Sequence, residues 1–167
     1  MPDSPAQRID ALMKQASTAL VARRYFECER LASDALQIAF GAADYERMAR
    51  ILLPLQEARR QKRDLALDAG RVFQITGDLP LPGETQPGCY LIAPPRVGLD
   101  GRLLREQADR DGVPVVVVVR EPLTRSGHWP IVALGPVTLR LKIDPPGPEH
   151  LARPATKKSR TNGAARK

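Results

Sequence analysis

The sequence predicts an α+β protein with a helical module over residues 1–69, a small mixed α/β module over residues 70–144 and a basic tail over residues 145–167. Apolar residues recur at helical spacing through the first module. From Arg71 onward the apolar period becomes two and β-branched residues dominate, which indicates short strands. The tail is rich in proline, glycine, alanine and basic residues and has no apolar period, so it is expected to be disordered.

Three helices are expected in the first module. Ser4 and Pro5 suit the start of the first helix, because serine caps a helix and proline fits its first position. The second helix is expected to start near Tyr25. Asp44 can cap the third helix, in which Pro54 removes a backbone donor and is expected to produce a kink. The predicted apolar faces comprise Ile9, Leu12, Met13, Ala16 and Leu20, then Cys28, Leu31, Ala32, Ala35, Leu36 and Ala39, then Tyr45, Met48, Ile51, Leu52 and Leu55.

Five strands and one crossover helix are expected in the second module. The strand segments are 71–76, 89–94, 113–119, 130–134 and 137–143. Asp100 is predicted to cap a short helix between the second and third strands, which makes a βαβ unit. The run Val115–Val119 is typical of a parallel strand that is covered on both faces. Gly135 and Pro136 predict a hairpin between the last two strands.

The segment "RRYFECERLASDAL", residues 23–36, resembles the turn and second helix of a tetratricopeptide hairpin. The matching positions are Ala16, Tyr25, Cys28, Ala35 and Leu36. The resemblance covers about one repeat unit, residues 9–42, and departs from the pattern at Gln15, Ala19 and Phe40. It implies a helical hairpin whose usual task is to bind another protein, whereas an ordinary three-helix bundle without a binding task is the alternative.

Arginine-rich segments supply the candidate partner or anion contacts. Arg23 and Arg24 precede the second helix, and the run 57–64 contains Arg59, Arg60, Lys62 and Arg63. This run is either the solvated end of a helix, where cations favour the helix dipole, or a site for an acidic partner.

Two loops at the carboxyl ends of the predicted parallel strands are further candidates. Residues 94–98 and 120–130 contain Arg96, Arg120, Arg125 and Trp129. Arginine and tryptophan side chains can hold a phosphate, a carboxylate or a planar group. No glycine-rich phosphate loop is present, so a polar surface loop with Trp129 packed on the sheet is the alternative.

Enzyme chemistry has little support in the sequence. His128 has Ser126 and Cys89 as its only candidate partners, and no strained nucleophile elbow or metal-ligand spacing surrounds them. We therefore expect neither catalysis nor a cofactor. Cys28 and Cys89 are predicted to be small buried thiols. The chain has no apolar run long enough for a membrane span and no signal-peptide pattern, and it is rich in arginine and alanine, which predicts a cytoplasmic bacterial protein.

Two functions remain from the sequence. The first is a protein-interaction module that uses the tetratricopeptide-like hairpin. The second is a nucleic-acid-associated protein whose tail neutralises phosphates without reading bases. The formal net charge is +7, and the tail carries six basic side chains against Glu149. The candidate phosphate contacts in the tail are Lys157, Lys158 and Arg160.

Overall fold

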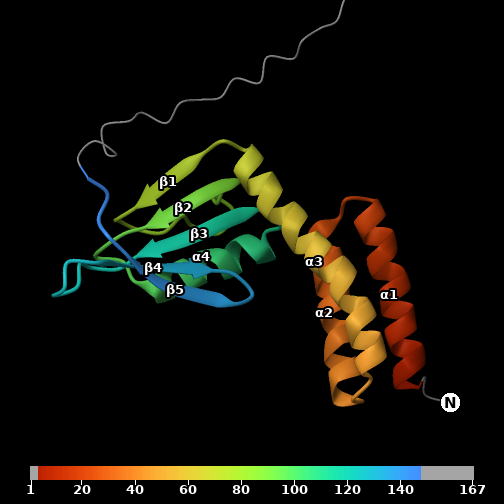
Figure 1. The fold of residues 1–167 in the computed structure, drawn as a ribbon. Coiled ribbons are helices and arrows are strands. Elements are labelled where there is room, and N and C mark those ends of the chain that lie inside the picture. Colours follow the sequence, from red (N-terminus) through yellow and green to blue (C-terminus); the bar gives the residue numbers. More distant parts are fainter. Residues whose placement is uncertain (1–3, 148–167) are drawn as a thin grey trace, which may run out of the picture.

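The computed structural model describes residues 4–147 and contains three helices followed by a five-stranded sheet (Figure 1). The helices are α1 (Pro5–Val21), α2 (Tyr25–Gly41) and α3 (Tyr45–Asp68). The third helix is the longest, and it extends from the helical module to the start of the sheet. The predicted order of helices and strands is confirmed, and the tail beyond residue 147 lies outside the described residues.

The helix starts follow the predicted capping residues. The Ser4 side chain accepts a hydrogen bond from the Gln7 amide, and the Gln7 side chain accepts one from the Ser4 amide, which completes a capping box. The Asp44 carboxylate accepts from the Arg47 amide at the start of α3. Pro54 lies inside α3, and the helix continues on both sides of it.

The two turns of the helical module have the same conformation. Arg23 and Ala43 occupy the left-handed region, with φ values of 59° and 52°. In each turn, the next amide donates to the carbonyl oxygen five residues earlier, from Arg24 to Ala19 and from Asp44 to Ala39. These bonds satisfy carbonyl groups that the helix ends leave open. Three-residue turns therefore fold the helices back on one another.

The core of the helical module contains many small side chains. It comprises Ile9, Ala16, Ala19, Cys28, Leu31, Ala32, Ala35, Ala39, Ile51, Leu55 and Ala58. Alanine at the contacts lets helices approach closely, and α2 packs against both α1 and α3. The predicted apolar faces of α1 and α2 agree with this core, although Leu52 and Tyr45 of the predicted third face are exposed.

The sheet has the strand order β1-β2-β3-β4-β5. Its strands are β1 (Val72–Ile75), β2 (Gly88–Ile92), β3 (Val115–Arg120), β4 (Trp129–Leu134) and β5 (Thr138–Ile143). The first three strands are parallel to one another, and the last two pairs are antiparallel. The predicted hairpin joins β4 to β5. The crossover helix α4 (Gly98–Arg110) joins β2 to β3 and starts two residues before Asp100, whose carboxylate accepts from the Val97 amide at 2.7 Å.

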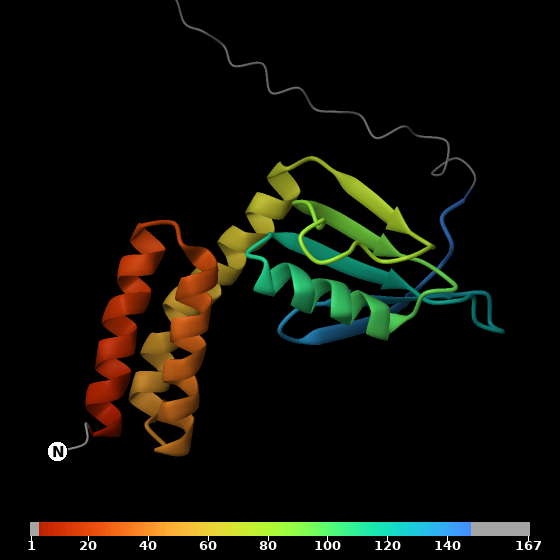
Figure 2. The same ribbon diagram turned by 180° about the vertical axis from the view of Figure 1, so that it is seen from behind.

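One face of the sheet is covered by α4 (Figure 2). Gly101 permits the close approach, because a Cβ atom there would lie 2.6 Å from Val119 and 2.7 Å from Leu134. The buried residues of this interface are Tyr90, Ile92, Leu104, Val117, Val119 and Val132. The second core of the protein therefore lies between α4 and the centre of the sheet.

The opposite face of the sheet corrects one prediction. The run Val115–Val119 was expected to be covered on both sides, but its alternate residues Val116 and Val118 remain partly exposed. On that side they line a groove that α3 also lines. The run of valines fits a doubly covered strand by composition, but the described part of the chain provides only one cover.

Candidate functional site

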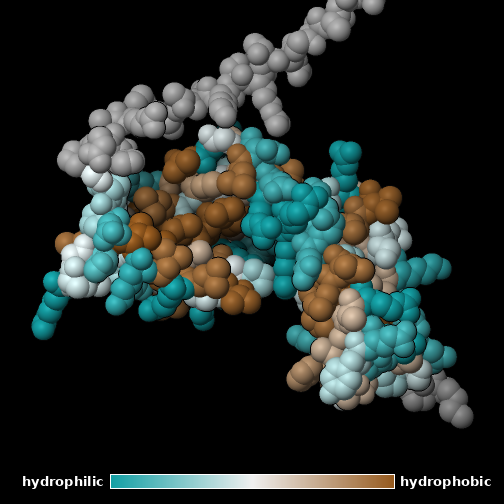
Figure 3. All heavy atoms as spheres, viewed as in Figure 1, coloured by the Kyte–Doolittle hydropathy of each residue, from teal (hydrophilic) through white to brown (hydrophobic). Residues whose placement is uncertain are grey.

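The uncovered side of the sheet is mainly apolar. Side chains alternate between the two faces of a strand, so residues between those that contact α4 point the other way. We call this surface the open face; it comprises Val72, Cys89, Leu91, Val116, Val118, Trp129, Ile131, Ala133, Leu139, Leu141 and Ile143. Viewed from the side away from α4, apolar residues form a broad area over the strands (Figure 3). Contiguous exposed apolar areas are a general feature of surfaces that bind other molecules.

The edge strand β5 shows most clearly that the two sides of the sheet differ in polarity. Its open-face side chains Leu139, Leu141 and Ile143 are 60%, 48% and 38% exposed. The intervening residues, Thr138, Arg140 and Lys142, point to the side of α4. A solvated edge strand places its polar side outward and its apolar side on a core. In β5 the apolar side faces outward from the described fold and remains exposed.

A groove of about 780 Å³ lies where the open face meets α3. Val116, Val118 and Leu139 contribute to its sheet side. Its helix side includes Leu53, Gln56, Arg60 and Arg63, which we call the α3 wall. The spacing of three, four and three residues places these four side chains on one face of α3. The groove therefore combines an apolar floor with a polar and basic wall.

Lys62 holds the wall in position relative to the sheet. Its ammonium group lies 2.8 Å from Glu29 of α2 and also pairs with Asp109 of α4. It lies 4.0 Å from the centre of the Phe26 ring. The Lys62 side chain is only 13% exposed, so these contacts are poorly screened by solvent. One cation on α3 thus connects this helix to α2 and α4 beside the groove.

Glu29 is the anionic centre of the same network. Burial by itself raises the pKa of Glu29, but hydrogen bonds from Lys62 and Arg59 outweigh it and hold the pKa below its usual value. The Arg59 Nε atom lies 2.7 Å from the Glu29 carboxylate. Glu29 is therefore ionised in the folded protein at neutral pH and compensates both cations.

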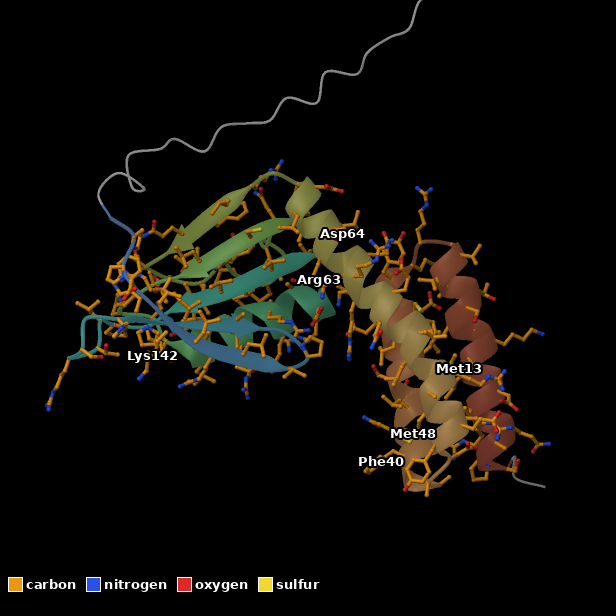
Figure 4. The ribbon with its side chains drawn as sticks, in the orientation of Figure 1. Met13, Phe40, Met48, Arg63, Asp64 and Lys142 are labelled. Carbon is orange, nitrogen blue, oxygen red and sulfur yellow. The ribbon has the colours of Figure 1, made fainter. Side chains whose placement is uncertain are left out.

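Cations without ion-pair partners stand at the two ends of the open face. Arg63 is exposed at the α3 end and makes no ion pair within residues 4–147. Figure 4 shows it at the end of the sheet nearest α3. At the other end of β3, Arg120 lies 4.9 Å from the centre of the Trp129 ring and has no carboxylate partner in the described part of the chain. Both guanidinium groups remain available to an anion.

Half of the arginines that the sequence predicted as contacts in residues 4–147 already pair with carboxylates of this chain. Arg59 pairs with Glu29 and Arg60 with Glu57, and Arg60 also reaches Asp64. The hydrogen bond from Arg60 is the main cause that lowers the pKa of Glu57 to about 2. Arg23 and Arg24 lie at the α1–α2 turn, and Arg24 pairs with Glu27. The structure does not bring this turn and the arginines of α3 together in the groove, because the pocket includes Arg59 and Arg60 alone among these four.

The residues of the predicted loop site do not form one site, because each of them lies in a different environment. Arg96 donates to the Gly77 carbonyl oxygen and to Asp78, which connects the β1 loop to the start of α4. Arg125 is exposed at the tip of the β3–β4 connection. Arg120 and Trp129 instead belong to the far end of the open face. A smaller cavity of about 420 Å³ lies on the other side, between the start of α4 and β5.

Ser126, His128 and Asp144 lie close together near that loop. The Ser126 Oγ atom is 3.1 Å from His128 Nδ1, and His128 Nε2 is 3.5 Å from Asp144. A nucleophilic triad needs a buried carboxylate that orients the imidazole. The Asp144 side chain is 92% exposed, so it lacks this property. The cluster instead stabilises the turn in which the Thr124 hydroxyl accepts from the His128 amide.

The two cysteines occupy different environments. Cys28 is buried, and that burial raises the pKa of its thiol, as expected for an unreactive core residue. Cys89 is only half-buried and belongs to the open face, so the prediction of a buried thiol is wrong for this residue.

Within the described ranges, no group of three or more His, Cys, Asp or Glu residues is arranged to hold a metal ion. None of the helices described here is long and apolar enough to cross a membrane.

Sequence reasoning missed the main features of this surface. The alternation Leu139, Leu141, Ile143 was visible, but the direction of its apolar side depends on which face α4 covers. Arg63 was noticed only as one member of a basic run. Only the structure shows which cations the carboxylates of α2 and α4 contact, and therefore that Arg63 makes no ion pair within residues 4–147.

Comparisons with protein-family models, curated proteins and solved structures find no match to this chain.

Proposed function

We propose that this chain is a non-enzymatic protein-interaction module, an adaptor or scaffold whose partner binds on the open face and against the α3 wall. The observation that carries the proposal is the apolar side of β5, which faces away from every described core. Burying such a surface contributes about 25 cal/mol for each Å² of apolar area removed from water. A partner therefore gains affinity from a surface that the described residues leave exposed.

The helical module supports this surface. In this proposal α1 and α2 form a tetratricopeptide-like hairpin, and α3 is the helix that presents the wall to the partner. Ile51 and Leu55 of α3 are buried in the helical core, while Leu53 is 72% exposed toward the groove. The hairpin thus holds one side of α3 and leaves the other side free for contact.

A comparative capture experiment tests the proposal. The tagged full chain and its Leu141→Gln variant are used to capture proteins from a bacterial lysate treated with nuclease. Phe40→Gln is the matched control, because Phe40 is 72% exposed at the far end of the helical module (Figure 4). Both changes replace an exposed apolar side chain with an amide, and each is expected to alter the free energy of unfolding by less than about 0.5 kcal/mol.

We expect a defined set of proteins to be captured by the wild-type chain and by Phe40→Gln, and to be lost with Leu141→Gln. Circular dichroism establishes that all three chains are folded. Capture that is equal for all three chains would contradict the open face as the binding surface. Loss with Phe40→Gln alone would transfer the site to the turn between α2 and α3.

A nucleic-acid-associated function is the second proposal, and it rests on the charge of the tail. Lys157, Lys158 and Arg160 lie outside the described residues, so this proposal has only the sequence behind it. Replacing these three residues with glutamine should weaken binding to duplex DNA equally for all base sequences. Undetectable binding of the wild-type chain at low salt would exclude this function.

A further inference from the structure

We propose that the occupant of the open face is an acidic amphipathic helix of a partner protein, lying along the strands between Arg63 and Arg120. This inference rests on the proposed function and adds the chemistry of the partner. It follows from the size of the open face, from the position of α4 on the other side of the sheet, and from the charges at the two ends.

The dimensions of the open face suit a single helix. Five strands spaced by about 4.8 Å and up to six residues long give a surface of roughly 20 Å by 20 Å. On the other face, α4 has 13 residues. A helix of that length is about 20 Å long and about 10 Å wide, so it spans the strands from end to end. All-parallel sheets have helices on both faces, and the parallel strands β1 to β3 of this mixed sheet have no second helix lying along the open face among the described residues.

The charges around the groove select an acidic occupant. Its lining contains five basic side chains against three carboxylates. Arg59, Arg60 and Lys62 are compensated by carboxylates of this chain, whereas Arg63 is not. A helix that buries its apolar stripe on Val118 and its neighbours brings its flanking residues close to Arg63. A glutamate or aspartate there forms a charge-assisted pair, while a lysine is repelled.

The position of Arg120 determines the spacing that we expect between acidic residues of the partner helix. Arg63 lines the same groove as Val115 and Val116, which begin β3, and Arg120 ends that strand. Five strand steps separate the two ends by about 17 Å. At 1.5 Å per residue, that distance corresponds to about 11 residues of a helix. The partner helix is therefore expected to carry acidic residues about three turns apart, on either side of an apolar stripe.

A pair of synthetic peptides tests this inference with the full chain. Both are amphipathic helices of about 16 residues with a leucine stripe. One carries glutamates at the two positions about three turns apart, and the other carries lysines there. Binding of each fluorescent peptide is measured by anisotropy at low salt. We expect the glutamate peptide to bind about tenfold more tightly than the lysine peptide, which corresponds to 1.4 kcal/mol.

Charge reversal identifies the responsible side chains. Arg63→Glu combined with Arg120→Glu should abolish or invert the preference for the glutamate peptide. Lys142→Glu is the matched control, because Lys142 is an exposed lysine of β5 on the side of α4. Figure 4 shows it at the end of the sheet away from α3. This control should keep the preference, and circular dichroism confirms that each variant is folded.

Several outcomes would overturn the inference, and they are distinguishable from failure of the proposed function. Equal affinity for both peptides, lost with Leu141→Gln, would refute the acidic helix but retain the open face as a protein-binding surface. A second outcome is that neither peptide binds, that the wild-type chain is a dimer and that Leu141→Gln is a monomer. This outcome would identify a second copy of the chain as the occupant. Absence of binding by a monomeric chain, or displacement of the glutamate peptide by a duplex oligonucleotide, would also refute the acidic helix.

Discussion

Replacing Lys62 with methionine should loosen the connection between the helical module and the sheet. Breaking a fully buried ion pair costs about 3–5 kcal/mol, and breaking an exposed pair costs about 0–1 kcal/mol. Lys62 and Glu29 are 13% and 15% exposed, which places this pair near the buried limit. Each carboxylate keeps a second cation, however, since Glu29 retains Arg59 and Asp109 retains Arg105. We therefore expect Lys62→Met to destabilise the fold by about 2 kcal/mol.

The assay is urea unfolding at neutral pH, followed by circular dichroism. In thermal unfolding of a domain of this size, a loss of about 2 kcal/mol corresponds to a decrease in the melting temperature of about 4–8 °C. Methionine retains apolar packing on the Phe26 ring, so the loss is mainly electrostatic. Lys142→Met, which removes an exposed lysine, should change stability by less than about 0.5 kcal/mol. An equally small change for Lys62→Met would refute the view that this ion network positions the α3 wall.

Three further changes test the packing and the network. Gly101→Ala should cost about 1–3 kcal/mol in urea unfolding, because its Cβ atom would lie 2.6 Å from Val119, and an unchanged midpoint would contradict the close packing of α4. Ala35→Leu should also cost about 1–3 kcal/mol, because Ala35 is fully buried in α2, and a harmless substitution would show that the helices have room between them. The folded-state pKa of Glu29 lies below the ordinary value of 4.5, so its stabilising contribution is complete above about pH 4.5 and decreases as the pH falls through the lower folded value. The stability difference between the wild-type chain and Glu29→Gln should therefore narrow from pH 7 to pH 3, and a constant difference over that range would contradict the pairing.

The sequence was sufficient for the positions of the helices and strands because their ends carry local signals. Ser4 and Asp44 cap helices through contacts with residues three positions away, and these contacts are visible in the sequence. The change from helical to alternating periodicity after Gly70 likewise marks the start of the sheet. The cap of α4 was misplaced by three residues, from Val97 to Asp100, because Asp100 interacts with the first turn from its third helical position.

The candidate site was harder to predict because its properties depend on contacts between distant segments. Arg59 was a candidate partner contact, but its carboxylate partner Glu29 lies 30 residues earlier on another helix. The exposure of Val116 and Val118 also depends on the tertiary structure, because a run of valines has the same composition whether its cover comes from its own chain or from a partner. Arg120 and Trp129 were expected in a loop site, and their place at the end of the open face followed only from the strand register.

Alkylation of Cys89 tests most directly whether a partner covers the open face. The half-buried Cys89 thiol lies on that face, whereas Cys28 is buried in the helical core and serves as the internal reference. Labelling is compared between the purified chain and the chain recovered in complex with its captured partner, with mass spectrometry of the two cysteine peptides. We predict that Cys89 reacts in the purified chain and is protected in the complex, while Cys28 stays unreactive in both. Equal labelling of Cys89 in the free and bound chains would contradict the open face as the partner's binding surface.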